Sequence, residues 1–299
     1  MADGEIGFIG IGNMGSAMVR CLARAGFRLH LYDQRANVLL PFSEPGGPFV
    51  IARALADLAG AADVVITMLP DSKAVRAVAL GSDDGGGLAA QLRPGSIIVD
   101  MSSSFPLATV ALGEELEFRG IRLVDAPVSG GVPRAASGTL AIMAGGAEED
   151  LARVEPVLKA MGSVHRTGKL GSGHAMKALN NYVSAAGLIA TCEALVIGQR
   201  FGLDGATMTR VLNASTGRNN TTENKVERYI LNRAFNSGFA LALLNKDVGM
   251  ARALAEELGV AADGLDYVAS QLAHALKALG ADADHTAVYE YIEGPGEGA

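Results

Sequence analysis

The residues of this chain best suited to chemistry lie in one segment, Gly171-Ser-Gly-His-Ala-Met-Lys-Ala-Leu-Asn-Asn181. Two glycines lead into a helical pattern in which Lys177 and Asn181 are four residues apart, so both side chains leave the same helical face. Burying such polar groups without partners costs about 1–3 kcal/mol each. Either this helix begins in solvent, where lysine and asparagine are common, or the two side chains have a chemical task.

A glycine motif near the N-terminus predicts a dinucleotide site. The apolar run Ile6–Ile9 ends in Gly10-Ile-Gly-Asn-Met-Gly15, which opens an amphipathic helical pattern. In such a motif the first glycine permits a tight turn, the second lets the backbone approach a pyrophosphate, and the third allows close packing of helix on strand. The pyrophosphate would lie at the positive N-terminus of the helix. The cofactor-binding residues expected here are Gly10, Ile11, Gly12, Asn13, Met14 and Gly15.

An acid at the end of the second strand supplies the context that this motif needs, because the glycines alone would also suit a turn that binds nothing. Asp33 comes 18 residues after Gly15. Its carboxylate can accept hydrogen bonds from the adenosine ribose and would repel the 2′-phosphate of NADP, so NAD is predicted. Arg35 keeps NADP possible, since a guanidinium can accommodate a phosphate, although it could instead cover the adenine face from the surface.

Strands and helices that could position these residues alternate over residues 5–167. Short apolar strands alternating with helical patterns favour a parallel sheet with helices on both faces. Strands are expected at Ile6–Ile9, Arg28–Tyr32, Val64–Met68, Ile97–Asp100, Leu123–Asp125 and Leu140–Ala144. Helices are expected at Met14–Ala25 and Leu151–Met161, and loops at Pro41–Pro48 and Gly81–Gly87.

From about residue 172 the strand signals vanish and helical patterns follow one another. They cover roughly 173–201, 204–214, 220–232, 240–258, 263–279 and 284–292. The first would be about 45 Å long at 1.5 Å per residue, long enough to join two domains. The sequence therefore predicts an α/β Rossmann-type doubly wound sheet over residues 1–167, followed by an all-α C-terminal domain over residues 168–299 that a long helix introduces.

Composition narrows the classes of partner. The net charge of −7 provides no basic field for nucleic acid. Cys21 and Cys192 lie in apolar helical patterns and are expected to be buried thiols.

The first residues are unlike a signal peptide, and no run approaches 18 apolar residues, so we expect a cytoplasmic protein without a membrane partner. The histidines have no metal-ligand spacing, so no metal is predicted, and the tail from Glu293 to Ala299 is expected to be disordered.

A series of motifs in a fixed order resembles the β-hydroxyacid dehydrogenases, the family that includes 3-hydroxyisobutyrate dehydrogenase. The motifs are Phe8–Met18 (with Ile11 where leucine is usual), Met68–Asp71, Asp100–Ser104, Asp125–Gly131 with Gly138–Leu140, Gly171–Asn181 and Lys246-Asp247. The resemblance implies NAD(P)-dependent oxidation of a small β-hydroxy acid. It also implies a C-terminal domain like that of 6-phosphogluconate dehydrogenase, and a homodimer or homotetramer made through that domain.

The resemblance also assigns roles to single residues. Lys177 would be the general acid/base that moves the hydroxyl proton, with Asn181 bonded to the substrate or to the lysine. Free lysine, with a pKa of about 10.4, is a poor base at neutral pH unless burial or a second cation such as Lys246 lowers that pKa. The expected substrate-anchoring loop is Ser129, Gly130 and Gly131, and further cofactor contacts are expected from Leu69, Pro70, Ser103 and Lys246.

Simpler roles stay open for several of these residues. Ser103, which stands where the family usually has threonine, could cap a helix. Ser129–Gly131 could be only a turn, and Lys246 could form a surface ion pair on its helix. His174 is expected to be a packing or capping residue rather than an acid or base.

The loop Asn213-Ala-Ser-Thr-Gly-Arg-Asn-Asn220 bears on the choice of substrate. It resembles a serine-rich Gly-Arg loop of 3-hydroxyisobutyrate dehydrogenases, which would make Arg218 a substrate-binding cation. Those enzymes usually carry an aromatic residue after the arginine, whereas Asn219 and Asn220 follow here. A more polar substrate, such as tartronate semialdehyde or L-serine, therefore stays open beside 3-hydroxyisobutyrate, and the loop could also merely link two helices.

Three other classes compete with this interpretation. A decarboxylating 6-phosphogluconate dehydrogenase usually has a much longer helical half, and an imine reductase typically lacks a lysine at the position of Lys177. A non-catalytic NAD-binding scaffold would tolerate the joint loss of Lys177, Asn181 and Ser129, yet all three are present.

Overall fold

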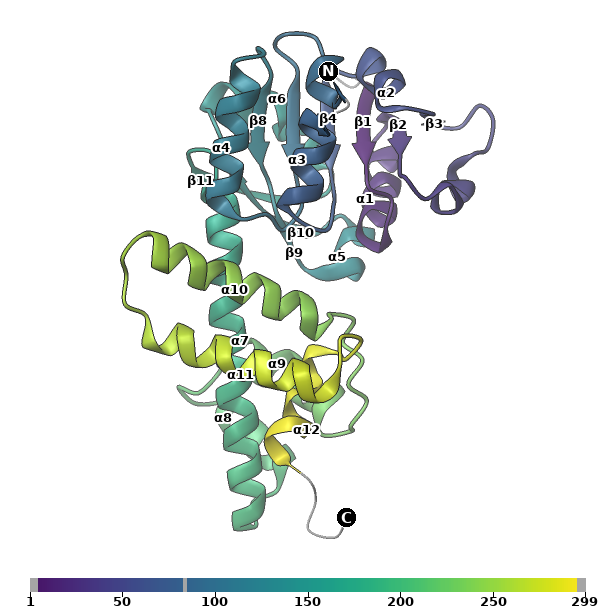
Figure 1. The fold of residues 1–299 in the computed structure, drawn as a ribbon. Coiled ribbons are helices and arrows are strands. Elements are labelled where there is room, and N and C mark those ends of the chain that lie inside the picture. The colour runs from purple at the N-terminus through teal and green to yellow at the C-terminus, as the bar shows by residue number, and fades with distance from the viewer. Residues whose placement is uncertain (1–4, 83–84, 295–299) are drawn as a thin grey trace. The chain divides into compact units, whose positions relative to one another are not determined.

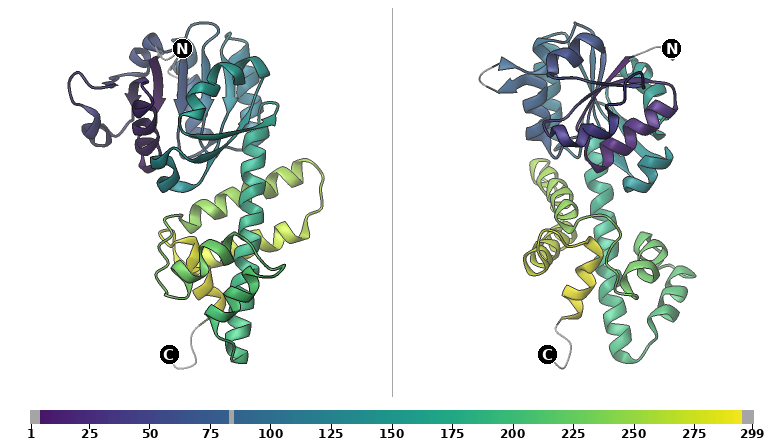
Figure 2. Two further views of the ribbon diagram at one scale, coloured as in Figure 1. Left: turned by 180° about the vertical axis from the view of Figure 1, so that it is seen from behind. Right: turned by 90° about the vertical axis from the view of Figure 1, so that its right-hand side faces the viewer.

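The computed structural model describes residues 5–82 and 85–294 and divides the chain into two compact units, Met1–Lys177 and Ala178–Ala299 (Figures 1 and 2). The boundary lies inside helix α7 (Ser172–Phe201). The sequence placed it between residues 167 and 168, before this helix. The difference arises because the first turn of α7 packs with the sheet of the first unit. Residues 295–299, which make up most of the segment predicted to be disordered, lie outside the described part.

Unit 1 is built on one large sheet whose strand order is β11-β10-β8-β7-β4-β1-β2-β3 (Figure 1). The strands are β1 (Glu5–Ile9), β2 (Arg28–Tyr32), β3 (Phe49–Ile51), β4 (Val64–Thr67), β7 (Ile97–Asp100), β8 (Arg122–Asp125), β9 (Val128–Ser129), β10 (Leu140–Gly145) and β11 (Gly162–Gly168). The six strands expected from the sequence are all present. From β8 through β3 neighbouring strands are parallel, which confirms the predicted Rossmann-type core.

The predicted parallel sheet carries antiparallel pairing at one edge. β10 runs antiparallel to β8, and β11 is parallel to β10. The chain turns back after β8 through β9, whose Ser129 pairs with Ala141 in an antiparallel register. The sequence gave no signal for β11 because this edge strand, Gly-Ser-Val-His-Arg-Thr-Gly, is polar and largely exposed.

Helices cover both faces of the sheet, as predicted. On one face α1 (Asn13–Arg24), α5 (Gly131–Ser137) and α6 (Glu148–Lys159) contribute to a core that contains Met18 and Leu158. On the other, α2 (Leu55–Ala61), α3 (Ser72–Leu80) and α4 (Pro106–Glu117) bury Leu58, Val75 and Leu116. Successive strand residues alternate between the two cores, and β7 is buried along its whole length, which is typical of a parallel sheet covered on both sides.

Two predicted loops contain short regular structure. The 3₁₀-helix η1 (Ala36–Phe42) overlaps the start of the loop expected at 41–48. Within the loop expected at 81–87, β5 (Gly81–Ser82) pairs with β6 (Gly85–Gly86), and the 3₁₀-helix η2 (Leu88–Ala90) follows. Residues 83 and 84 lie outside the described part.

Unit 2 is helical throughout its described residues. After α7 come α8 (Gly205–Asn213), α9 (Asn220–Asn224), the π-helix η3 (Val226–Ile230), α10 (Leu241–Glu257), α11 (Asp263–Leu279), the 3₁₀-helix η4 (His285–Ala287) and α12 (Val288–Glu293). The core joins α7, through Leu188 and Cys192, to α10 and α11, through Val248 and Leu272. The helix expected over 220–232 is thus broken into an α-turn and a π-turn.

Within the described residues, α7 is long and apolar enough, by length and composition, to cross a membrane. The prediction concerned an unbroken run of 18 apolar residues, whereas α7 qualifies by its average composition, with Ser184, Thr191 and Glu193 between its apolar residues. The apolar composition has a different explanation in this fold, because Leu188, Ile189, Cys192 and Leu195 of α7 are buried in the core of unit 2. A core helix of this kind passes the same test as a membrane span.

Candidate active site

The glycine motif forms the turn between β1 and α1, and its three glycines differ in what surrounds them. Gly10 has a φ of 98°, and a Cβ on Gly15 would lie 1.9 Å from the Gly10 carbonyl oxygen. Both positions therefore need glycine for the turn and for the approach of helix to strand. Gly12 is different, since the nearest group to its Cβ position is the Arg35 guanidinium at 3.7 Å. The missing side chain leaves its backbone open, as contact with a pyrophosphate requires.

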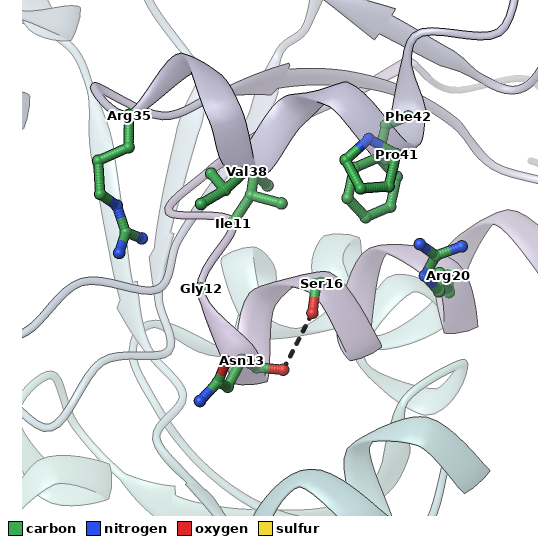
Figure 3. Close-up of a pocket in the computed structure, with 9 residues that line it drawn as sticks. All are labelled: Ile11, Gly12, Asn13, Ser16, Arg20, Arg35, Val38, Pro41 and Phe42. Atoms are coloured by element: carbon green, nitrogen blue, oxygen red, sulfur yellow. Dashed lines mark hydrogen bonds between the residues drawn. The ribbon is translucent and has the colours of Figure 1, made fainter.

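The first turn of α1 offers free donor capacity beside this glycine. Gly12 is the N-cap, no side chain caps the helix, and no acid lies in its first turn. A pocket of about 380 Å³ opens between α1 and η1 (Figure 3). It is lined by Ile11, Gly12, Asn13, Ser16, Arg20, Arg35, Val38, Pro41 and Phe42. Two arginines and no carboxylate line it, so the residues present fit the phosphates of a dinucleotide.

Asp33 and Arg35 lie together at the end of β2. The Ile11 N–H donates to Asp33 Oδ2 over 2.8 Å, and the Arg35 N–H donates to Oδ1 over 2.9 Å. The Arg35 guanidinium contacts the same carboxylate at 3.2 Å and stays more than half exposed. Burial raises the pKa of Asp33, but the hydrogen bonds and charge of Arg35 with the Ile11 amide outweigh it, so the net pKa lies below its ordinary value. The carboxylate is thus ionised and fixed at the edge of the pocket.

The turns after β4 and β7 are tied to one another at the carboxyl edge of the sheet, where ligands bind in open α/β folds. The Leu69 N–H donates to Ser102 Oγ over 2.9 Å, and Ser104 Oγ donates to Asp100 Oδ2 over 2.7 Å. Pro70 is exposed and Ser103 is half-buried. The N-cap of α4 is Phe105, so Ser103 is not the capping residue of that helix.

Ser129, Gly130 and Gly131 form the turn from β9 into α5. Gly130 and Gly131 have φ values of 131° and 67°, which L-residues with side chains rarely adopt. Both glycines are exposed, and Ser129 is half-buried and paired with β10. Their backbone therefore lies open to a ligand, as a carboxylate-anchoring loop needs, although a turn alone would have the same geometry.

Lys177 lies in the second turn of α7, and the start of this helix is buried. The Asp125 carboxylate accepts the Gly171 N–H over 2.8 Å and the His174 N–H over 2.7 Å. A Cβ on Gly173 would lie 2.2 Å from the Met143 carbonyl oxygen, so glycine is what lets the helix reach β10. Lys177 is only 9% exposed. The simple alternative of a helix that begins in solvent is therefore wrong.

In unit 2 the structure joins Asn181 to the Lys246-Asp247 motif on α10. Asn181 Nδ2 donates to Asp247 Oδ2 over 2.6 Å, and both residues are buried. Lys246 Nζ lies 3.9 Å from Asp247 Oδ1, and its side chain is 30% exposed. Asp247 thus fixes the amide of Asn181, which lies one turn beyond Lys177 along α7.

Arg218 is not brought to this cluster. It is 64% exposed and forms an ion pair with Glu223 at 3.4 Å. The neighbouring Asn219 donates to Thr191 Oγ1 on α7 and accepts the amides that begin α9. Thr191 is ten residues beyond Asn181, about 15 Å along the helix axis. Within unit 2 the loop therefore lies some three turns away from Asn181.

Residues 5–171 match the family model described as the NAD binding domain of 6-phosphogluconate dehydrogenase. Residues 171–292 match the model described as the NAD-binding domain of NADP-dependent 3-hydroxyisobutyrate dehydrogenase. The mitochondrial 3-hydroxyisobutyrate dehydrogenase of Rattus norvegicus is 38% identical, over 83% of this chain and 74% of the rat protein. The chain belongs to the β-hydroxyacid dehydrogenase family. The predicted family, fold class and nicotinamide cofactor are thereby confirmed, and the protein is an NAD(P)-dependent dehydrogenase that acts on a hydroxyl group.

Two further relatives of this β-hydroxyacid dehydrogenase carry names that mention serine. The NAD-dependent L-serine dehydrogenase of Pseudomonas aeruginosa is 34% identical, over 84% of this chain and 85% of the relative. The solved structure of Mycobacterium tuberculosis 3-hydroxyisobutyrate dehydrogenase with L-serine has a TM-score of 0.88 and 32% identity. It covers 98% of this chain and all of that one.

Three buried acids of the dehydrogenase were missed as candidates by residue-type reasoning. They are Asp100, Asp125 and Asp247, none more than 2% exposed. Each lies inside a motif that the sequence already singled out. A usable signal was available for Asp100 and Asp125, because an acid at the end of a buried strand needs a partner and acids are almost never fully buried without one.

Within the part of the chain that the structure describes, no three histidine, cysteine, aspartate or glutamate side chains group as metal ligands would. The absence of a metal nevertheless stays a prediction.

The Asn181–Asp247 contact yields a kinetic prediction. Replacing Asp247 with leucine, of similar size, removes the charged acceptor that holds the Asn181 amide. A hydrogen bond to a charged group contributes about 1.5–3 kcal/mol, so we expect kcat/KM to fall roughly tenfold to a hundredfold. Asp247→Asn keeps an oxygen acceptor and serves as the control, with a smaller loss. Equal steady-state kcat/KM in Asp247→Leu and the parent enzyme would contradict the prediction that catalysis needs the Asn181 amide held by Asp247.

Proposed function

We propose that this dehydrogenase oxidises a small β-hydroxy acid similar to 3-hydroxyisobutyrate, with Lys177 as its general acid/base. The observation that carries the proposal is the burial of Lys177 in a helix whose first turn is anchored by Asp125, at the end of β8. The loop Ser129–Gly131 begins four residues after that acid. A proton-transfer group and an open backbone loop are thus built from adjoining segments of unit 1.

The proposed reaction moves a hydride to the dinucleotide and a proton to Lys177. When bound, the dinucleotide supplies the nicotinamide carbon that accepts hydride from the alcohol. The uncharged amine of Lys177 takes the hydroxyl proton as the C–O bond becomes a carbonyl, and its ammonium form returns that proton in the reverse direction. The Asn181 amide, held by Asp247, orients the oxygen or the lysine. The backbone at Ser129, Gly130 and Gly131 receives the substrate carboxylate.

L-Serine or tartronate semialdehyde is the second candidate substrate. It is supported by the relatives whose names carry L-serine. The sequence adds that Asn219 and Asn220, rather than an aromatic residue, follow Arg218. Arg218 itself is exposed and paired with Glu223, so the structure gives it no part in this candidate.

NAD is the preferred cofactor in this proposal, with NADP as a possible substitute. The ionised Asp33 at the end of β2 would accept hydrogen bonds from the adenosine ribose and repel a 2′-phosphate. Arg35 already neutralises part of that charge, and Arg20 lines the same pocket. Both arginines favour some acceptance of NADP.

The proposed assembly is a homodimer or homotetramer formed through α7, working in the cytoplasm without nucleic-acid or membrane partners. Apolar residues of α7 lie exposed at helical spacing, among them Val183 at 67%, Ile197 at 69% and Phe201 at 83%. Ala190 and Ala194 occupy the same face between Val183 and Ile197. Small residues between large apolar ones suit close packing of this face against a second copy of itself.

The proton-transfer role predicts the effect of removing the amine. In Lys177→Ala we expect kcat to fall by about 10²- to 10⁴-fold, the usual contribution of general acid–base catalysis, while the Kd for NAD changes less than about twofold. The measurement is NAD reduction with 3-hydroxyisobutyrate, L-serine and glycerate, and NADH oxidation with short semialdehydes. Lys177→Arg, which stays charged, serves as a control for packing. Unchanged turnover in Lys177→Ala would remove Lys177 from this role.

The cofactor proposal predicts a change of preference in Asp33→Asn. Removing the charge weakens NAD binding and relieves the repulsion of a 2′-phosphate, so the NAD:NADP ratio of kcat/KM should shift at least about tenfold toward NADP, equivalent to 1.4 kcal/mol. Arg35→Ala, the matched variant, should lower NADP binding more than NAD binding in fluorescence titrations. A parent enzyme that prefers NADP strongly would overturn the assignment of Asp33.

The assembly proposal predicts that charge on α7 separates the subunits. Val183→Glu and Ile197→Glu should each convert an oligomer to monomers in analytical ultracentrifugation, because a buried unpaired carboxylate is costly. Val211→Glu, on α8 and 58% exposed, is the control that should leave the assembly unchanged. A monomeric parent protein, or two α7 variants with unchanged mass, would refute an interface on this face.

A further inference from the structure

His174 is completely buried and contacts groups from four segments of unit 1. Its Nε2 lies 3.1 Å from the Ser102 carbonyl oxygen and 3.6 Å from Asp100 Oδ2. Its Nδ1 lies 2.9 Å from Thr109 Oγ1 and 3.7 Å from Asp125 Oδ2. The imidazole therefore sits between two carboxylates, one at the end of β7 and one at the end of β8.

The hydrogen bonds constrain the protons on this ring. Nε2 must carry a proton, because the Ser102 carbonyl can only accept. Thr109 Oγ1 has a second partner, the Phe105 carbonyl oxygen at 3.2 Å, to which it donates. When the hydroxyl proton points to Phe105, Nδ1 must donate to Thr109 Oγ1. In that arrangement both ring nitrogens are protonated and His174 is an imidazolium.

Electrostatics favours the same charged form. Asp100 and Asp125 are 1% and 0% exposed, and a buried carboxylate is costly unless a nearby cation and hydrogen bonds compensate. Burial raises the pKa of the Asp125 carboxyl, and the charge of His174 is the largest effect that opposes the rise. One imidazolium between the two acids leaves the trio with a net charge of −1 rather than −2.

The trio connects the segments that the proposed reaction uses. Asp100 Oδ1 accepts from the Thr67 hydroxyl and the Ser102 N–H, and Ser102 Oγ in turn holds the Leu69 N–H. Asp125 holds the amides of the first turn of α7. His174 links the two acids, and Lys177 follows it by three residues on the same helix.

We propose that His174 is an imidazolium held between Asp100 and Asp125, and that this buried ionic trio positions the first turn of α7 and therefore Lys177. His174 is a positioning residue in this inference, since it acts through Lys177. The inference rests on the proposed function of Lys177, but the charge state of His174 can be measured without any turnover. The charged groups in contact with the ring are Asp100 from β7 and Asp125 from β8, while α4 contributes only the Thr109 hydroxyl.

The charge state is tested by ¹⁵N NMR of the histidine ring nitrogens in the whole protein without cofactor, with the His174 signals assigned through His174→Gln. At pH 7.5 we expect both ring nitrogens of His174 to be protonated, as its hydrogen bonds to Ser102 and Thr109 require. Asp125→Asn should give a neutral ring at the same pH. A parent spectrum in which one His174 nitrogen is unprotonated would overturn the inference.

The positioning role is tested by kinetics of His174→Gln. A displaced lysine should lower kcat by about tenfold to a hundredfold, while the KM for NAD stays within about twofold. Leu158→Ala leaves a cavity in the core beneath α6 and is the control for lost stability. Its kcat per folded molecule should equal that of the parent enzyme. His165→Gln, at an exposed strand position, controls for the exchange itself. Equal kcat in His174→Gln and Leu158→Ala would refute positioning.

These outcomes separate the inference from the function on which it rests. If Lys177→Ala retains turnover while the NMR signals show a charged His174, the proposed function fails and the ionic trio stands. If Lys177→Ala loses turnover while His174 is neutral, the proposed function stands and the trio fails.

Discussion

The buried start of α7 depends on one carboxylate, that of Asp125, which accepts the Gly171 and His174 amides. A helix end leaves its first amides without partners inside the helix, and here that end is buried. Asp125 satisfies one of those donors, the His174 amide, together with the amide of Gly171 just before the helix. This anchor holds the start of α7 against the sheet, and Lys177 lies buried in the next turn.

The glycines around this anchor explain why the arrangement needs its sequence. Gly173 permits the helix to approach β10, and a Cβ on Gly145 would lie 2.6 Å from Asp125 Oδ1. Space around the carboxylate is therefore reserved for backbone donors. The same logic operates at the cofactor end, where Gly15 lets α1 approach β1 and Gly12 leaves the backbone uncovered. Helices α1 and α7 thus both begin at glycines whose missing side chains let the helix approach a strand.

Much of the architecture could be predicted from the sequence because its signals are local. Buried strands such as β7 are continuous apolar runs, and the acid of Asp33 follows one at the expected distance from the glycines. The edge strand β11 could not be found this way, because a strand that buries little has no apolar pattern. The reversal of β10 was equally hidden, since strand direction depends on pairing between distant segments.

In the candidate site, too, some features have local sequence signals and others depend on segments far apart in the chain. The residue types and spacing of Lys177 and Asn181 were visible in the sequence. The partner of Asn181, Asp247, is 66 residues away. Asp125, which anchors the start of their helix, is 46 residues away from Gly171. Arg218 illustrates the opposite case, in which a plausible cation lies on an exposed loop beside Glu223. Spacing along one helix is encoded locally, whereas burial and pairing are decided by segments that meet only in the fold.

The boundary between the two units falls directly after Lys177, within the unbroken α7. The lysine therefore belongs to the same compact unit as the dinucleotide turn, while Asn181, Lys246 and Arg218 belong to the helical unit. An exchange of the C-terminal unit at this point, by recombination or in the laboratory, would keep Lys177, the proposed proton-transfer group, with the dinucleotide turn. It would replace Asn181, Lys246 and Arg218 together as one module.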